Sequence, residues 1–227
     1  MSDVGFDAVL FDAGGVLVLP DPTVLAPLLA PYGGSTDIGR HRRAHYAAMA
    51  VKSRLDHGEH DWAAYDDTYV RALGVDDEVA PLAARVLGAC RIPELWRWPI
   101  PESVRGVRHL HDRGIPLGVV SNASGQIADT LCRAGICQIG DGDGVTVRCV
   151  IDSFVVGVAK PDPAIFDHAA REFGGIERSR IVYVGDSVSI DIVAATAAGL
   201  RPVLLDPFGD HVGAPFERIG EVADLLR

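Results

Sequence analysis

A short apolar run that ends on one carboxylate constrains this chain more than any other feature of its sequence. Residues 8–11 are apolar, Asp12 follows them directly, and Gly14 and Gly15 come next but one. This pattern predicts a short buried strand that ends in a sharp turn. Open parallel sheets bind their ligands at the carboxyl ends of their strands. Asp12 is therefore either a nucleophile or metal ligand, or an Asp that caps a turn, and these residues alone leave both open.

The second half of the chain alternates between strand-like and helix-like segments. Such alternation indicates βαβ units, and hence a doubly wound, Rossmann-like parallel sheet with helices on both faces. We therefore predict an α/β fold. A polar loop at residues 138–148 resembles a calcium loop only superficially, and we expect a hairpin turn or a mobile loop there. The expected strands are residues 115–120, 150–156, 181–184 and 202–205, and the expected helices are 101–114, 125–135, 163–173, 190–199 and 219–226.

The first half of the chain differs, because residues 20–96 read as helical. Apolar side chains recur there at steps of three and four within residues 40–54, 61–73 and 76–90, which predicts three amphipathic helices. Prolines are concentrated at both boundaries of this stretch. We predict an inserted helical bundle at residues 20–96, and an α/β core made of residues 1–19 and 97–227.

Charge and composition exclude several classes of function. The net charge is −10 over 227 residues, and no cluster of Lys and Arg appears, so we expect neither nucleic acid nor a membrane as a partner. No apolar run approaches membrane-spanning length. The four cysteines lack metal-binding spacing, which favours free thiols and a cytoplasmic location. Trp96 and Trp98, near the expected hinge, either pack within the chain or support a homodimer.

Polar side chains follow two further expected strands, as Asp12 follows the first, and another precedes an expected helix. Ser121 and Asp186 could each cap a helix, and Lys160 could be a solvated surface lysine. Because the carboxyl ends of parallel strands share one edge, however, all of these side chains are expected to meet in one crevice. Their joint occurrence favours one site over separate accidents. The set comprises Ser121 and Asn122 after the second strand, Lys160 before a helix, and Asp186 and Asp191 after the strand at 181–184.

The motifs around these residues resemble those of the haloacid dehalogenase superfamily, and the resemblance covers nearly the whole chain. The four motifs correspond to residues 11–16, 120–122, 160–163 and 185–191. The resemblance implies that the α/β core carries the chemistry. It also implies that the helical insertion is the cap that this superfamily places after its first motif.

The resemblance further implies a Mg²⁺-dependent phosphatase of a small phosphorylated metabolite. Asp12 would be the nucleophile that forms an aspartyl-phosphate, with Ser121 and Lys160 as the other catalytic residues. Oxygen ligands suit Mg²⁺, and they would come from Asp12, the backbone carbonyl of Gly14, Asp186 and Asp191. The expected phosphate-binding residues are Gly14, Gly15, Ser121, Asn122 and Lys160.

Gly14 departs from the superfamily pattern. Most of its phosphatases have a second Asp at this position, which acts as acid for the leaving group and as base for water. General acid–base catalysis is worth about two to four orders of magnitude. Either water or a cap residue would have to act as acid and base in place of this Asp, or turnover would be slow. The cap candidates are His45, His57 and Glu59.

Two other interpretations stay open. Phosphonoacetaldehyde hydrolases, which cleave a carbon–phosphorus bond with a cap lysine, also have a small residue at this position. Lys52, one of only two lysines, lies in the expected cap. Dehalogenases lack the second Asp as well, but they also lack the acidic metal site that Asp186 and Asp191 indicate. The remaining interpretation is a catalytically weak module that binds phosphate and a partner protein.

Overall fold

Six parallel strands form the central sheet of this computed structural model, which describes residues 5–55 and 61–227. Their spatial order is β10-β9-β8-β1-β4-β7, and every neighbouring pair is parallel. The predicted α/β fold is therefore confirmed. β1 (Ala8–Phe11) lies between β8 (Ile181–Gly185) and β4 (Leu117–Ser121), and all of its residues are buried, which explains its unbroken apolar run. The other strands are β7 (Val150–Asp152), β9 (Arg201–Leu205) and β10 (Glu217–Ile219).

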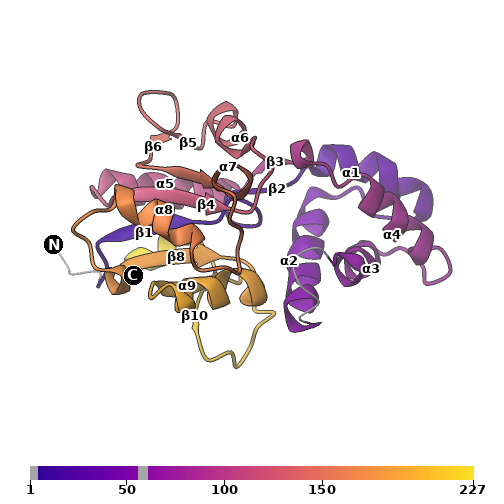
Figure 1. Ribbon diagram of the computed structural model, residues 1–227. Helices are drawn as coiled ribbons and strands as arrows, with labels where there is room; N and C mark the ends of the chain where they lie inside the picture. Colours follow the sequence, from indigo (N-terminus) through magenta and orange to yellow (C-terminus); the bar gives the residue numbers. More distant parts are fainter. Residues whose placement is uncertain (1–4, 56–60) are drawn as a thin grey trace.

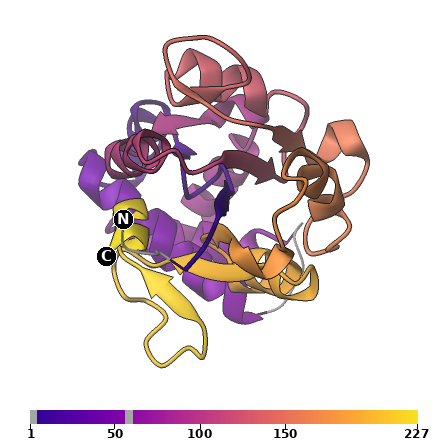
Figure 2. The same cartoon turned by 90° about the vertical axis from the view of Figure 1, so that its left-hand side faces the viewer.

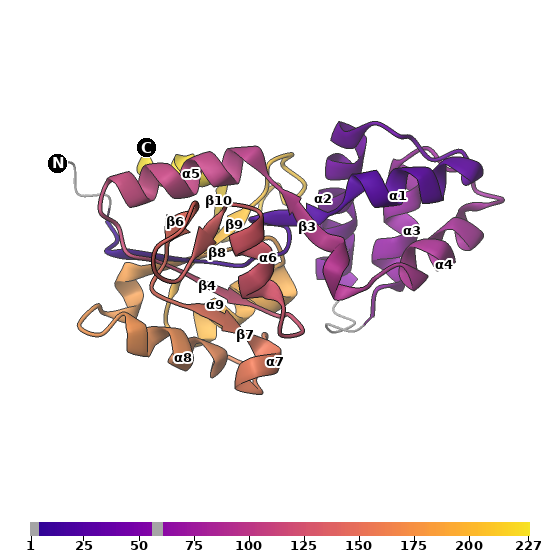
Figure 3. The ribbon, with the colours of Figure 1, turned by 90° about the horizontal axis from the view of Figure 1, so that it is seen from above.

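Helices cover both faces of this sheet, as predicted (Figure 3). On one face, α5 (Pro101–Asp112) and α6 (Ile127–Arg133) pack into a core that the 3₁₀ helix Val222–Leu226 completes. On the other face, α8 (Ile165–Glu172) and α9 (Val193–Ala197) form a second core. None of the helices among the described residues is both long and apolar enough to cross a bilayer.

Within the described residues, helices α1–α4 form a separate bundle beside the sheet (Figure 1). It has an apolar core of its own, in which Tyr65, Tyr69 and Leu73 are almost fully buried. In Figure 2 this bundle lies behind the sheet, which is seen from the side away from the bundle. We call the bundle the cap. Its helices are α1 (Pro22–Leu29), α2 (Ile38–Leu55), α3 (Ala63–Ala72) and α4 (Ala80–Ala89).

An antiparallel ribbon of two short strands leads from the sheet into the cap and back. It consists of β2 (Val18–Pro20) and β3 (Trp96–Pro99). The predicted boundaries of the insertion, at residues 20 and 96, fall at the cap end of this ribbon. The division of the chain into two domains at these positions stays a prediction.

Two expected elements have different bounds in the structure, one because a side chain caps a helix and one because its first residue belongs to a strand. The expected strand at 150–156 stops at Asp152, whose carboxylate accepts the Phe154 N–H at 3.0 Å and caps the helix α7 (Ser153–Val156). The expected helix at 219–226 begins only at Val222. Ile219 still belongs to β10, where its carbonyl accepts the Asp206 N–H, and a capping box formed by Glu221 and Asp224 starts the helix.

Of the two expectations for residues 138–148, a hairpin turn or a mobile loop, the hairpin turn is wrong. The short strands β5 (Cys137–Gln138) and β6 (Val145–Thr146) pair in parallel, so the chain between them makes a loop rather than a tight reversal. The amide of Gln138 organises this loop from inside, since it donates to the carbonyls of Gly140 and Gly144 and accepts the Gly144 N–H.

A methyl group at residue 118, in β4, would come too close to neighbouring side chains in the core. The Cβ of Gly118→Ala would lie 2.8 Å from Leu10 Cδ2 and 2.9 Å from Cys149 Sγ. We expect this substitution to lower the free energy of unfolding by about 1–3 kcal/mol, measured by chemical denaturation. Gly174→Ala is the control, because its nearest neighbour would be 3.8 Å away. Equal effects of the two substitutions would contradict the packing argument.

Candidate active site

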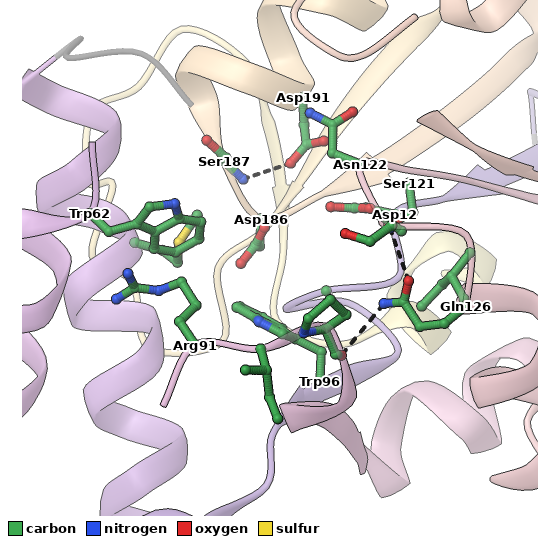
Figure 4. A pocket seen from close by; sticks show the side chains of 17 residues that line it. Asp12, Trp62, Arg91, Trp96, Ser121, Asn122, Gln126, Asp186, Ser187 and Asp191 are labelled. Carbon is green, nitrogen blue, oxygen red and sulfur yellow. Dashed lines mark hydrogen bonds between the residues drawn. The ribbon is translucent and has the colours of Figure 1, made fainter. Parts of the chain in front are cut away.

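The cavity at the carboxyl edge of the sheet brings together the polar residues that follow different strands (Figure 4). Asp12 follows β1, Ser121 ends β4 and Asp186 follows β8. The cavity has a volume of about 420 Å³. Residues of the cap and of the β2–β3 ribbon form the wall opposite the sheet. The described chain therefore forms a chamber over the sheet edge that is partly open to solvent.

Lys160 links the carboxylates at the bottom of this chamber. Its side chain is fully buried, and Nζ lies 3.1 Å from Asp12 Oδ1 and 2.7 Å from Asp191 Oδ1. Burial by itself lowers the pKa of Lys160, but Asp12 and Asp191 outweigh it and raise the pKa above its ordinary value. Lys160 is therefore an ammonium group at neutral pH, and it is not the solvated surface lysine that its sequence position also allowed.

Tyr183 is a site residue that the sequence did not reveal. It sits within the apolar strand β8, yet its hydroxyl accepts a hydrogen bond from Lys160 Nζ at 2.6 Å and lies 3.0 Å from Asp191 Oδ1. The second oxygen of Asp191 accepts the Ser187 N–H at 3.0 Å. Asp191 is thus held by Lys160, Tyr183 and the backbone, and it fixes the ammonium group beside Asp12.

Asn122 supports the lysine through the backbone. Its side-chain amide donates to the carbonyl of Lys160 and accepts the Lys160 N–H, both at 2.8 Å. This pair of bonds clamps the segment that carries Lys160 to the end of β4. Ser121 reaches Asp12 directly, because its side chain hydrogen-bonds that carboxyl group.

The carboxyl groups lie unusually close together for buried acids. Ligand atoms of Asp12, Asp186 and Asp191 all fall within 4.8 Å of one another. Burial, together with repulsion by Asp191 and Asp186, raises the pKa of Asp12 to about 7, although Lys160 and Ser121 pull it down. Burial also raises the pKa of Asp186. A cluster of hard oxygen donors with this excess of negative charge suits a divalent cation such as Mg²⁺.

The two glycines after Asp12 leave room for neighbouring side chains. Gly15 has φ of +70°, and a Cβ there would overlap the carboxylate of Asp186. At Gly14 a Cβ would lie 3.2 Å from the indole of Trp96, on the hinge ribbon. Trp96 therefore occupies the space beside residue 14, where the superfamily's second Asp would project.

His45 is one of the side chains that we predicted as the acid for the leaving group, but its position does not suit that role. It comes from α2 and is buried, and it is absent from the side chains that line the chamber in the described part of the chain. Its Nε2 lies 3.1 Å from Asp186 Oδ2, and its Nδ1 lies 2.9 Å from the hydroxyl of Tyr65. Since an ionised carboxylate accepts, Nε2–H donates to Asp186, and the hydroxyl of Tyr65 is the hydrogen-bond partner of Nδ1. The other two candidates, His57 and Glu59, lie outside the described residues.

Lys52, the candidate for carbon–phosphorus cleavage, is buried in the cap with Nζ 4.8 Å from the ring centre of Trp62. It is not among the described side chains that line the chamber. Trp62, in contrast, lines the chamber and also packs against the buried core of the cap. Trp96 also lines the chamber. Its indole ring therefore packs within the chain, at the candidate site.

Comparisons with known proteins agree with this geometry. A family model described as haloacid dehalogenase-like hydrolase matches residues 6–199. The chain is similar to a glyceraldehyde 3-phosphate phosphatase of Methanopyrus kandleri, with 32% identity over 71% of this chain and 70% of the relative. It is 28% identical to a phosphoserine phosphatase of Thermus thermophilus over 65% of this chain and 58% of that protein. A crystal structure of a HAD phosphatase from Thermococcus onnurineus matches 96% of this chain and 95% of its own, with a TM-score of 0.59 and 23% identity.

The raised pKa of Asp12 makes the stability of the metal-free protein depend on pH. The folded carboxyl group binds its proton more tightly than the unfolded one, whose pKa is about 3.9. Its contribution to stability is therefore complete below about pH 4 and is lost as the pH rises through about 7. We expect the Tm of chelator-treated protein to fall between pH 5 and pH 8, and to fall less in Asp12→Asn.

Asp129→Asn is the control for this measurement, because Asp129 is a solvent-exposed aspartate on α6. Its Tm should follow that of the unaltered protein at every pH. An equal fall of Tm in Asp12→Asn and in the unaltered protein would show that Asp12 does not titrate in this range.

Proposed function

The chain belongs to the haloacid dehalogenase-like hydrolases, and we propose that it is a Mg²⁺-dependent phosphatase of a small phosphorylated metabolite that works through an aspartyl-phosphate on Asp12. Its relatives support a hydrolase that acts on phosphoric monoesters. The observation that carries the finer proposal is the contact between Lys160 Nζ and Asp12 Oδ1, 3.1 Å apart, within a cluster of three acids.

In this proposal Asp12 attacks phosphorus with one carboxylate oxygen. The bond from phosphorus to the ester oxygen breaks, the alcohol leaves after taking a proton, and water then hydrolyses the acyl phosphate to regenerate Asp12 and release phosphate. Lys160 neutralises charge on the transferring group and on Asp12. The hydroxyl of Ser121 and backbone N–H groups around Asn122 and at Gly14 hydrogen-bond the phosphoryl oxygens. The Gly15 N–H, which we also expected to bind phosphate, donates to the Val18 carbonyl at 2.8 Å instead.

The acids of the cluster would hold the metal. Asp12, Asp186 and the carbonyl of Gly14 would contribute oxygens directly, and Asp191 would act through water, because Lys160, Tyr183 and the Ser187 N–H already engage its two oxygens. Bound Mg²⁺ would offset the repulsion between the Asp12 carboxylate and the phosphate, and would keep the two in line.

Of the acid candidates within the described residues, His45 is engaged elsewhere, and water serves as the acid and base in this proposal. Trp96 fills the space beside Gly14, and His45 is engaged by Asp186 and Tyr65, so neither position offers a free proton donor to the leaving group. Turnover should then be slow for an enzyme of this kind, since the second Asp is worth about two to four orders of magnitude. Carbon–phosphorus cleavage through Lys52 has less support, because Lys52 Nζ lies against the ring of Trp62 in the cap, whereas Lys160 Nζ contacts Asp12.

Asp12→Asn tests the nucleophile. We expect the substitution to reduce Mg²⁺-dependent phosphate release from a panel of phosphate esters by a factor on the order of 10⁴ or more. Beryllium fluoride, which mimics an acyl phosphate, should form a stable adduct with the unaltered protein and none with the variant, measured by ¹⁹F NMR. Asp129→Asn, at an exposed position of α6, is the control and should retain full activity. Phosphate release that survives in Asp12→Asn would rule out the aspartyl-phosphate.

Restoring the missing carboxylate tests the role of Trp96. Gly14→Asp alone should gain little, because its side chain runs into the indole ring. Combined with Trp96→Val, which opens that space, Gly14→Asp should raise kcat at least about 10-fold above Trp96→Val alone. Steady-state kinetics of the three variants give the comparison. If Gly14→Asp raises kcat in neither background, the absence of the acid does not limit turnover.

A further inference from the structure

We infer that Arg91 binds a second anionic group of the substrate, so that the preferred substrates are phosphate monoesters of small carboxylic acids. This inference rests on the proposed function and adds the substrate class to it. It starts from the two ends of the chamber in Figure 4, where Asp12 and Asp191 lie at the sheet and Arg91 and Trp62 lie on the cap side.

The end of the chamber nearest the cap is mostly apolar. Met49, Trp62, Ile92, Pro93 and Trp96 line it, and among the described residues there Arg91 is the charged one. An apolar wall with one charged group orients a ligand, because the single polar contact fixes which end of the ligand points towards it. A substrate whose phosphate lies at Asp12 therefore meets Arg91 with its far end.

Neighbours hold the guanidinium group of Arg91 in place. It donates a hydrogen bond to Asp66 of α3, and its central carbon lies 4.6 Å from the ring centre of Trp62 and 5.9 Å from that of Tyr65. The side chain still exposes 21% of its surface. An arginine whose geometry is fixed before binding loses less conformational entropy when a ligand arrives.

Arg91 keeps hydrogen-bonding capacity for a ligand. A guanidinium group has five N–H donors, and one hydrogen bond from this group, to Asp66, is present within the described chain. Trp62 covers a face of the group, which leaves the edge that carries the donors. A flat carboxylate matches such an edge with two parallel hydrogen bonds, whereas a neutral aldehyde or hydroxyl group would leave part of it unpaired.

The sheet end of the chamber suits the phosphate group. There the three acids exceed Lys160 in charge, which favours a metal and a phosphate. At the cap end Arg91 is paired with Asp66 and offers its remaining donors to the second group of the substrate. The chamber has a volume of about 420 Å³, which suits a small substrate.

The test compares two substrates that differ in this group. 2-Phosphoglycolate carries a carboxylate, and 2-hydroxyethyl phosphate has the same chain length and a neutral hydroxyl. We expect the unaltered protein to prefer phosphoglycolate. Arg91→Gln should reduce kcat/KM for phosphoglycolate roughly 10- to 100-fold, the usual worth of a charge-assisted hydrogen bond, and should reduce it less than about 3-fold for hydroxyethyl phosphate. The ratio of the two values does not depend on how much of the variant folds.

Two further variants complete the design. Arg91→Lys keeps the positive charge but lacks the paired N–H donors of the guanidinium group. It should retain part of the preference for phosphoglycolate. Arg71→Gln is the matched control, because Arg71 also pairs with aspartates of the cap, Asp67 and Asp77, but lies 40% exposed and away from the chamber. It should leave the ratio unchanged. A ratio that Arg91→Gln does not change, or a loss of equal size in Arg71→Gln, overturns the inference.

A binding measurement separates this inference from the proposed function. Calorimetry with Asp12→Asn in the presence of Mg²⁺ gives the affinity for each ester without turnover. Tighter binding of phosphoglycolate that disappears in Asp12→Asn combined with Arg91→Gln supports the anion site, even if the unaltered protein hydrolyses neither ester. Equal affinity for the two esters in Asp12→Asn overturns it.

Discussion

The buried ammonium group of Lys160 is the interaction on which the site depends. Three acids packed within 4.8 Å would repel one another in the absence of a cation, and unpaired buried charges cost several kcal/mol. Lys160 bridges Asp12 and Asp191, and its own segment is clamped to β4 by Asn122. Strand ends that are far apart in the chain are thus held at the distances that the proposed phosphoryl transfer needs.

Much of this architecture follows from local pattern. The apolar run of β1 predicts a strand buried on both faces, and the rule that parallel strands share an edge brings Asp12, Ser121 and Asp186 together. Two expected elements failed, one because of a long-range contact and one because of a local capping signal. The helix expected from Ile219 starts later, because that residue pairs with a strand formed elsewhere in the chain, and the capping signal of Asp152 was hidden within an apolar segment.

Two features of the site itself were beyond such patterns. In the sequence Tyr183 is one more residue of an apolar strand. The structure, in which β8 pairs with β1, shows that its hydroxyl contacts Lys160. Gly14 and Trp96 are separated by 82 positions, so the indole ring next to that glycine could not be inferred from either neighbourhood. Hydrophobic periodicity predicts which face is buried, but it does not predict which side chain from another element fills a given gap.

The position of Trp96 makes one piece of chain serve two purposes. As the first residue of β3 it belongs to the ribbon that joins cap and sheet, and its ring also forms the wall beside Gly14. The ribbon that connects the cap to the sheet and the wall of the chamber therefore share one residue, Trp96. A substitution chosen to loosen the connection between the two bodies would at the same time reshape the space next to the nucleophile, so mobility and chemistry are not independently adjustable in this protein.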